Sequence, residues 1–235
     1  MDDVSSHRVT SRPPTKADSA YSELRRAIVT GEIAGGVPLD EVELAEMFGL
    51  GRTPTREALK RLAVERFVLW LPRRSPIVAE MSVQDVKRLF EARAAMEDCV
   101  CQISATRITD AQVDRLNELC DGLGAALRSG DSYGAVEIDF ELHNLIAEGS
   151  QNKYLAHTIA TLNSGALRLW FQTFEQIPEP EDAVVAHKQI VDALARRDPE
   201  AASEATRRQM SRALQRQMQL GTEASPQKIH LSDAG

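Results

Sequence analysis

The segment "GRTPTREALKRL", from Gly51 to Leu62, predicts a short amphipathic helix with a basic outer face. Pro54 fits the first helical turn, where a backbone N–H has no intrahelical partner to lose. Arg52 and Arg56 lie four residues apart, so both project from one side at the amino-terminal end of the helix. The other side carries the apolar residues that predict its buried stripe: Ala58, Leu59, Leu62 and Ala63.

The sequence around this segment predicts two earlier helices and a later hairpin. Apolar spacing from residue 20 onward predicts a first helix that stops at Gly31, and residues 41–47 predict a second one. Gly49 suits a left-handed turn between the second and third helices. The segments "FVLWL" and "PIVAEM" then predict two short strands joined by the basic tip "PRRS". This order of elements is a winged helix-turn-helix.

Basic residues are concentrated around the predicted third helix, although the chain has a formal net charge of −7. Residues 1–80 hold 12 Lys and Arg against 12 Asp and Glu, so the rest of the chain carries the net negative charge. A local basic patch on an acidic protein favours a bound polyanion, and an ordinary solvated helix face is the alternative.

In a recognition helix, the amino-terminal end reaches the base edges of DNA. We therefore expect Arg52 and Arg56 to contact bases or phosphates of a double-stranded DNA operator. We expect Thr53, Thr55 and the wing residue Arg74 to contact phosphates.

The remainder of the chain predicts six amphipathic helices, at about residues 82–106, 109–129, 132–149, 152–176, 181–197 and 199–219. Six such helices form an antiparallel bundle, whose interior can hold a ligand or metal between facing helices. The predicted fold is therefore mostly α: a disordered arm (1–17), a winged helix-turn-helix (18–80), an all-helical effector-binding and dimerisation domain (82–220) and a flexible tail (221–235).

Several candidate site residues lie in the predicted bundle. Asp139 and His143 are four apart and share one helix face, a spacing that suits either a metal site or a helix-stabilising contact. Arg93 is expected to face the interior, either paired with Glu97 or as a clamp for an acidic effector. The further effector candidates of this type are Asn163 and Arg168.

Composition excludes other classes of protein. No apolar run approaches the length of a membrane span, and the first residues do not resemble a signal peptide, so we expect a cytoplasmic protein without membrane association. The three cysteines form neither an even disulfide framework nor a paired zinc-ribbon spacing.

Two groups of motifs carry a family resemblance. The stretch "GEIAGGVPLDEVELAEMFGLGRTPTREALKRLAVERFV" followed by "PRRSPIV" resembles the winged helix of GntR-type bacterial regulators. The stretches "LFEARAAMED", "EIDFELHNLIAEGSQN" and "AHKQIVDALARRDPEAASEA" resemble the helical FCD effector domain of the FadR subfamily. The chain departs from the usual pattern at Gly51, Thr55 and Val42, and at Arg66 and Ser75, where the family usually has glycine.

The resemblance implies a homodimeric transcription factor that acts as a repressor and whose DNA affinity is altered by a small carboxylate metabolite. It also implies a divalent metal held by an aspartate and three histidines. Asp139, His143 and His187 match three of these positions, whereas Gln209 stands at the fourth and is a weaker donor. Zinc is the expected metal, ahead of nickel or manganese, and a metal-free polar cavity is the alternative. No enzyme activity is expected.

Two other functions are consistent with these residues. A metal-dependent helical enzyme could use the same three ligands, although no nucleophile or general base accompanies them. A constitutive DNA-binding dimer would need no effector at all.

Overall fold

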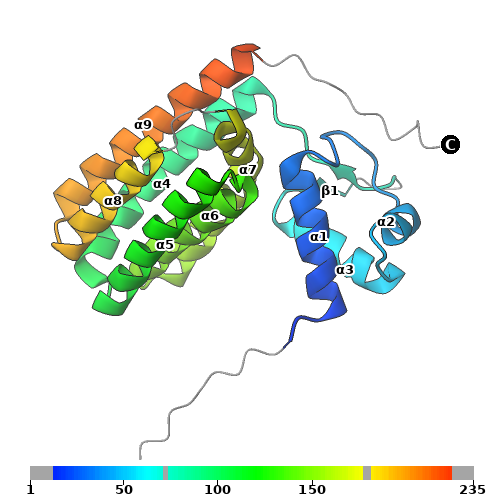
Figure 1. Cartoon of the computed structure of the whole chain (residues 1–235), viewed down its shortest axis with the longest axis horizontal. Helices are drawn as coiled ribbons and strands as arrows, with labels where there is room; N and C mark the ends of the chain where they lie inside the picture. Colours follow the sequence, from blue (N-terminus) through cyan, green and yellow to red (C-terminus); the bar gives the residue numbers. More distant parts are fainter. Residues whose placement is uncertain (1–12, 71–73, 177–180, 224–235) are drawn as a thin grey trace, which may run out of the picture.

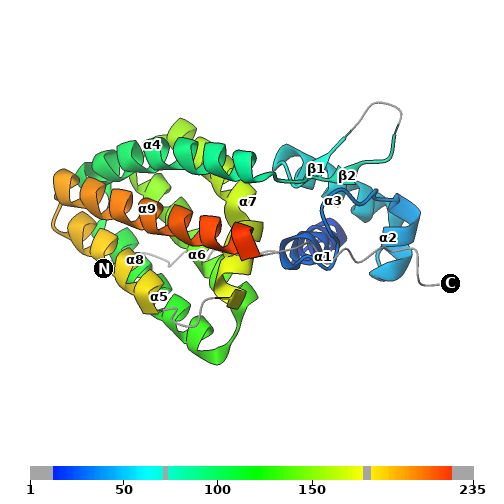
Figure 2. The ribbon, with the colours of Figure 1, turned by 90° about the horizontal axis from the view of Figure 1, so that it is seen from above.

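The computed structural model describes residues 13–70, 74–176 and 181–223. Within these ranges a small three-helix unit with a two-stranded hairpin lies beside a larger helical bundle (Figures 1 and 2). The mostly α fold, with a winged helix-turn-helix followed by a bundle, is therefore confirmed.

The winged helix-turn-helix consists of three helices and two short strands. They are α1 (Lys16–Thr30), α2 (Glu41–Met47), α3 (Arg52–Val64), β1 (Val68–Leu69) and β2 (Ile77–Val78). The strands pair antiparallel, with Val68 opposite Val78 and Leu69 opposite Ile77. They are shorter than the predicted extended segments, and the tip residues 71–73 lie outside the described residues.

Helix α1 begins earlier than the sequence pattern suggested. Thr15 is its N-cap and forms a reciprocal capping box with Asp18, so Lys16 and Ala17 are helical rather than part of a disordered arm. Gly31 ends the helix in the left-handed conformation, with φ of 81°. The predicted arm, residues 1–17, therefore includes the first two residues of α1. Residues 1–12 lie outside the described residues.

The bundle contains six helices in the described ranges. They are α4 (Val83–Arg107), α5 (Asp110–Ser129), α6 (Ser132–Gly149), α7 (Lys153–Gln176), α8 (Glu181–Ala195) and α9 (Pro199–Glu223). Helix α4 packs along α9, and α6 lies between α5 and α7. Helix α9 extends three residues into the predicted tail, whose residues 224–235 are not described. None of the described helices is long and apolar enough to cross a membrane.

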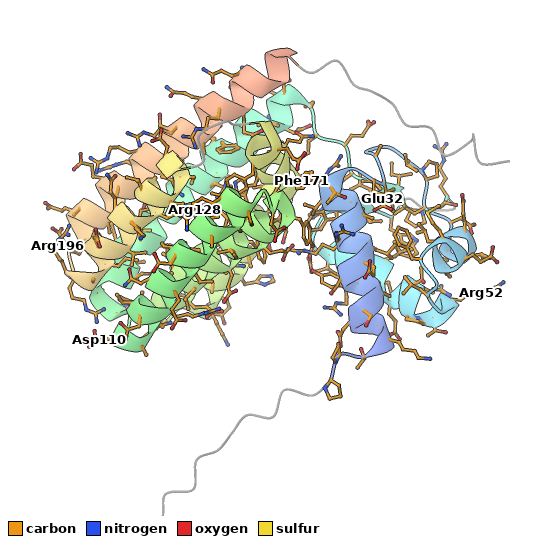
Figure 3. All side chains as sticks on the ribbon, in the orientation of Figure 1. Glu32, Arg52, Asp110, Arg128, Phe171 and Arg196 are labelled. Atoms are coloured by element: carbon orange, nitrogen blue, oxygen red, sulfur yellow. The ribbon has the colours of Figure 1, made fainter. Side chains whose placement is uncertain are left out.

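One hydrophobic cluster joins the two parts of the molecule. It contains Leu24 and Ile28 of α1, Leu59 of α3, and Leu167 and Trp170 of α7. Phe171, also on α7, packs against this cluster and lies on the side of the bundle that faces the winged helix (Figure 3). The winged helix therefore shares its core with the bundle.

Polar contacts reinforce the same boundary. The buried Arg25 of α1 forms an ion pair with Glu137 of α6. Arg168 of α7 donates a hydrogen bond of 2.7 Å to the carbonyl of Ala79, just after β2. Helix α6 thus contacts the first helix of the winged helix-turn-helix, and α7 contacts the segment after its last strand.

Arg66 occupies a conformation that favours glycine. It follows α3 with φ of 66°, and its amide donates to the carbonyl of Ala63. A non-glycine residue in this region costs about 1–2 kcal/mol. This explains physically why the resembling family usually has glycine at this position.

We predict that Arg66→Gly increases the free energy of unfolding by about 0.5–1 kcal/mol, because the relief of strain exceeds the entropy that glycine adds to the unfolded chain. Urea denaturation of the wild type and the variant measures the change. Arg66→Ala is the matched control: it removes the same side chain but keeps the β-carbon, so it should bring no gain. Equal effects of the two substitutions would contradict the backbone explanation.

Candidate DNA-contact surface and buried ligand site

The exposed side of α3 carries the residues predicted to contact DNA. Arg52, Thr53 and Arg56 are all exposed, and Arg52 lies on the side of the winged helix turned away from the bundle (Figure 3). Arg56 has one weak partner, Glu41, at 3.6 Å between Nε and Oε1. Arg74, beside the wing tip, is also exposed. These four side chains are free to meet a polyanion.

Thr55 is not available for the predicted phosphate contact. Its side chain is fully buried, and its hydroxyl donates a hydrogen bond of 2.9 Å to the carbonyl of Gly51. Thr55 faces the core because it lies three residues before Ala58 and four before Leu59, on the apolar side of α3. The prediction for Thr55 was therefore wrong.

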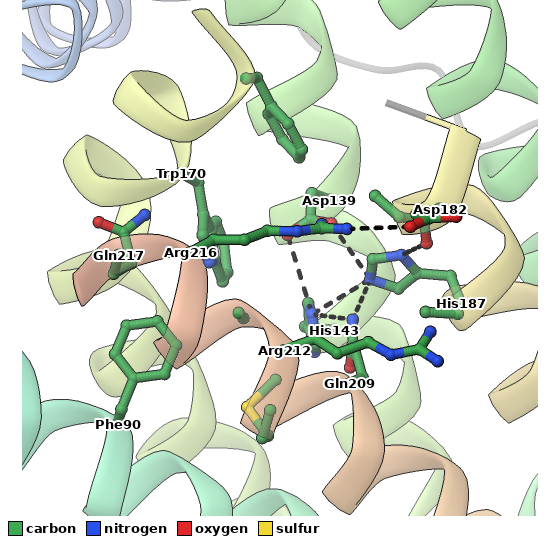
Figure 4. A pocket seen from close by; sticks show the side chains of 15 residues that line it. Phe90, Asp139, His143, Trp170, Asp182, His187, Gln209, Arg212, Arg216 and Gln217 are labelled. Carbon is green, nitrogen blue, oxygen red and sulfur yellow. Dashed lines mark hydrogen bonds and ion pairs between the residues drawn. The ribbon is translucent and has the colours of Figure 1, made fainter. Parts of the chain in front are cut away.

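The bundle brings the predicted metal ligands together. Asp139 and His143 come from α6, His187 from α8 and Gln209 from α9, and all four are buried. His187 Nε2 lies 3.1 Å from Asp139 Oδ1 and 3.3 Å from His143 Nε2. Figure 4 shows these side chains converging among the residues that line one cavity. Asp139, His143 and His187 each offer one ligand atom, and these three atoms lie within 4.8 Å of one another.

Hydrogen bonds outside the cluster orient both imidazoles. His143 Nδ1 lies 2.9 Å from Glu97 Oε2, and His187 Nδ1 lies 2.8 Å from the carbonyl of Ala183. Each Nδ1 is therefore the hydrogen-bond donor to its outer partner, and each Nε2 faces the interior of the cluster. Outer partners of this kind orient the histidine ligands in metal sites.

The spacing of the two imidazoles suits a small divalent cation. Two nitrogens bound tetrahedrally at about 2.0–2.1 Å from zinc are about 3.3–3.4 Å apart. The observed separation of 3.3 Å between His143 Nε2 and His187 Nε2 agrees with that value. Two unprotonated Nε2 atoms at this distance would repel each other, so a pair of neutral imidazoles needs a proton donor or a cation between them.

Gln209 can satisfy the cluster in two ways. As assigned, its amide Nε2 lies 2.6 Å from His187 Nε2 and 3.4 Å from His143 Nε2, which leaves its Oε1 buried without a hydrogen-bond partner in the described structure. A rotation of the terminal amide by about 180° exchanges the positions of Oε1 and Nε2 and leaves the rest of the side chain in place. Turned over, Oε1 would point at the cluster as a fourth donor. The orphaned oxygen is the observation that makes these residues fit a metal.

The pKa values in the cluster follow from burial and neighbouring charges. Burial opposes ionisation of Glu97, but Arg93 and His143 outweigh it and lower the pKa of Glu97 to about 2. Burial also opposes protonation of His143, yet Glu97 raises the pKa of His143 above its usual value. The pKa of His187 is lowered, mainly by burial. Burial therefore favours the neutral form of His187.

Arg93 and Asn163 support the cluster and do not line the cavity. Arg93 is fully buried, with Nη2 2.7 Å from Glu97 Oε1 and Nε donating to Asn163 Oδ1 at 3.2 Å. Its guanidinium also lies 4.6 Å from the ring centre of Trp170. Pairing with Glu97, one of the two predicted roles, is the one observed. Direct contact with an effector, predicted for both residues, is not available from these positions.

Arg168 is likewise absent from the cavity. Its bond to the Ala79 carbonyl places it at the boundary with the winged helix. Its neighbours on α7 explain this position: Leu167 and Trp170 belong to the cluster shared with α1. The prediction of Arg168 as an effector ligand was therefore wrong.

A cavity of about 50 Å³ opens beside the cluster. Its wall includes Trp170, whose ring stacks on His143 with centroids 5.5 Å apart. Its mouth includes three charged residues that the sequence analysis missed: Asp182, Arg212 and Arg216. Arg212 lies three residues after Gln209, and Arg216 lies four residues after Arg212. This spacing places all three on one face of α9, and it could have identified both arginines.

The architecture described above is that of a winged-helix regulator of transcription. A family model described as "Bacterial regulatory proteins, gntR family" matches residues 16–78, and one described as "FCD domain" matches residues 88–212. The chain belongs to the GntR family of bacterial regulators, and its FCD domain agrees with the resemblance to the FadR subfamily.

Similar proteins support this assignment. The HTH-type transcriptional repressor RspR of Escherichia coli K12 is 30% identical over 185 residues, covering 79% of this chain and 81% of RspR. The solved structure of E. coli McbR/YncC has a TM-score of 0.72 at 20% identity and covers 89% of this chain and 98% of that one. A putative GntR regulator from Rhodococcus sp. RHA1 has a TM-score of 0.68 at 20% identity, covering 87% and 98%. The relatives are transcription regulators, not enzymes.

We predict that Arg93→Met lowers the free energy of unfolding by about 3–5 kcal/mol, because the buried Glu97 would lose its permanent counter-charge and keep only the imidazole of His143 as a partner. Thermal and urea denaturation measure the loss. Arg88→Met, on the same helix but exposed and 3.9 Å from Asp85, is the control and should change stability by less than about 0.5 kcal/mol. A similar small effect at Arg93 would contradict the buried-pair interpretation.

Proposed function

We propose that this protein is a cytoplasmic, homodimeric repressor of transcription. Its affinity for operator DNA is controlled by a small carboxylate that binds beside a divalent metal in the bundle. One observation carries this proposal: the three convergent ligand atoms of Asp139, His143 and His187 lie in a cavity whose wall, Trp170, belongs to the core of the winged helix. The repressor role is supported by the name of the relative RspR.

The metal would be held by Asp139 Oδ1 and the two Nε2 atoms, with Gln209 Oε1 as a weak fourth donor. Two imidazoles and a carboxylate suit zinc, ahead of nickel or manganese. The bound metal would supply an open coordination position for a carboxylate oxygen of the effector. The protein residues orient the ligands, exclude bulk water and shape the cavity around that position.

Contacts along α7 connect the cavity with DNA binding. Trp170 stacks on His143 in the cavity and packs in the same cluster as Leu24 and Ile28 of α1. On the same helix, Arg168 holds the carbonyl of Ala79 after the wing. A ligand that shifts Trp170 or α7 therefore acts directly on the packing of the winged helix.

The effector needs only a small difference in affinity between two geometries of the dimer to control DNA binding. In a dimer, the two α3 helices must match half-sites about one helical turn of DNA apart. An effector that prefers the unmatched geometry by about 2.7 kcal/mol lowers operator occupancy about 100-fold. This is within the usual range of coupling energies between two sites.

We predict near-stoichiometric divalent metal in protein purified without chelator, and its loss in His143→Ala, because the substitution removes one of two imidazole ligands. Mass spectrometry of the elements in the native protein measures the content. Gln209→His should raise zinc affinity at least about tenfold, since imidazole is the better donor.

His157→Ala is the matched control for metal binding, since His157 is an exposed histidine on α7 outside the cluster. It should retain the wild-type metal content. Absence of metal from the wild type after zinc addition would overturn the metal part of the proposal and favour Gln209 as the amide donor to both imidazoles.

We predict that Arg56→Ala weakens specific operator binding by about 1–3 kcal/mol, because an arginine contact at a base edge has about this energy. Operator DNA is first selected from random duplexes with the wild-type protein, and fluorescence anisotropy then measures affinity. Arg115→Ala, an exposed arginine on α5, is the control of equal charge change. Unchanged affinity of Arg56→Ala would reject the assignment of α3 as the recognition helix.

A further inference from the structure

We propose that Arg212 and Arg216 form an anion subsite at the mouth of the cavity, so that the effector is a small dianion with a short apolar spacer. This inference rests on the proposed function, because the first anionic group would occupy the open position at the metal. It adds the chemical class of the effector and the residues that select it.

Arg212 is positioned to bind an anion. It lies one helical turn beyond Gln209 on the same face of α9, about 4.5 Å further along the helix axis. It lines the cavity, and it has no hydrogen bond or ion pair within the described part of the chain. Figure 4 shows its side chain running past Gln209 beside the ligand cluster. An unpaired guanidinium at a cavity mouth is a ready partner for a carboxylate.

Arg216 lies one turn further along α9 and is held only loosely. Its Nη2 is 3.6 Å from Asp182 Oδ2, and the Asp182 side chain is 71% exposed. Figure 4 shows Arg216 extending across the cavity toward Asp182. A long ion pair to an exposed carboxylate contributes little to stability. A ligand carboxylate can therefore replace Asp182 as the partner of Arg216 at small cost.

The charges around the cavity are balanced by two negative charges on the ligand. Arg93 and Glu97 neutralise each other behind the cluster. A divalent metal with Asp139 leaves one positive charge, and the two mouth arginines with Asp182 leave another. One excess charge lies at the base of the cavity and one at its mouth. A monoanion would neutralise only the first.

The size and lining of the cavity limit the spacer between the two anionic groups. About 50 Å³ is available, and one water molecule needs about 10–15 Å³, so roughly three to five small groups fit. The lining of the cavity is largely apolar and includes Trp170, Met210 and Ala213. A chain of a few methylene carbons between two carboxylates meets both conditions.

Calorimetric titrations of the zinc-loaded, full-length dimer with malonate, succinate, glutarate and butyrate test this inference. Butyrate matches succinate in carbon number but lacks the second carboxylate. We expect the best of the three dicarboxylates to bind at least about tenfold tighter than butyrate, the factor given by one charge-assisted hydrogen bond. Equal affinities would overturn the inference.

Three variants locate the effect. Arg212→Met should lower the affinity for the best dicarboxylate to that of butyrate and leave butyrate binding unchanged. Arg208→Met, on the same helix but paired with Glu204 and outside the cavity, should change neither. Asp182→Asn should tighten dicarboxylate binding because it frees Arg216. A dicarboxylate preference that survives Arg212→Met would overturn the assignment of the subsite.

The outcomes separate this inference from the proposed function. If butyrate and the dicarboxylates bind equally well and release operator DNA, the carboxylate-controlled regulator stands and the dianion subsite is rejected. If neither class binds while metal content and operator binding are normal, both the subsite and the carboxylate effector are rejected.

Discussion

The buried guanidinium of Arg93 is the constraint on which the ligand site depends. A fully buried charge needs a counter-charge, and Glu97, one turn further along α4, provides it. The same carboxylate holds Nδ1 of His143, so it determines which nitrogen of that imidazole faces the cavity. One buried ion pair thus orients the central ligand of the cluster. Asn163 and Trp170 complete the enclosure of Arg93 from α7.

The second organising feature is the core that the winged helix shares with α6 and α7. A flexible linker between the two parts would let the bundle bind ligands without consequence for α3. Here, Trp170 contacts His143 on one side and belongs to the cluster of Leu24 and Leu59 on the other. Close-packed interiors transmit small displacements because they have no free volume to absorb them. This packing supports the proposed transmission of ligand binding from the bundle to the winged helix.

Gln209 gives the site its individual chemistry. A third imidazole at this position would hold a metal more firmly, whereas an amide oxygen is a weak ligand that an incoming carboxylate can rival. The same face of α9 continues from Gln209 to Arg212 and Arg216, so the weak donor and the two cations lie along one wall of the cavity. The proposed metal site would therefore depend more on a bound anion than a site with three histidines would.

The sequence alone determined the helix order, the wing and the pairing of Asp139 with His143 on one helix face, because helical periodicity and spacing are local properties. His187 and Gln209 were added only by the family resemblance, since they lie on other helices. It misjudged Thr55 and Arg168, and it missed the part of α9 that forms the mouth of the cavity. The roles of these residues depend on which face of their helix packs against another helix. Only the tertiary structure decided that Arg93 supports the cluster from behind and that Arg168 holds the wing, since both are buried by helices distant in sequence.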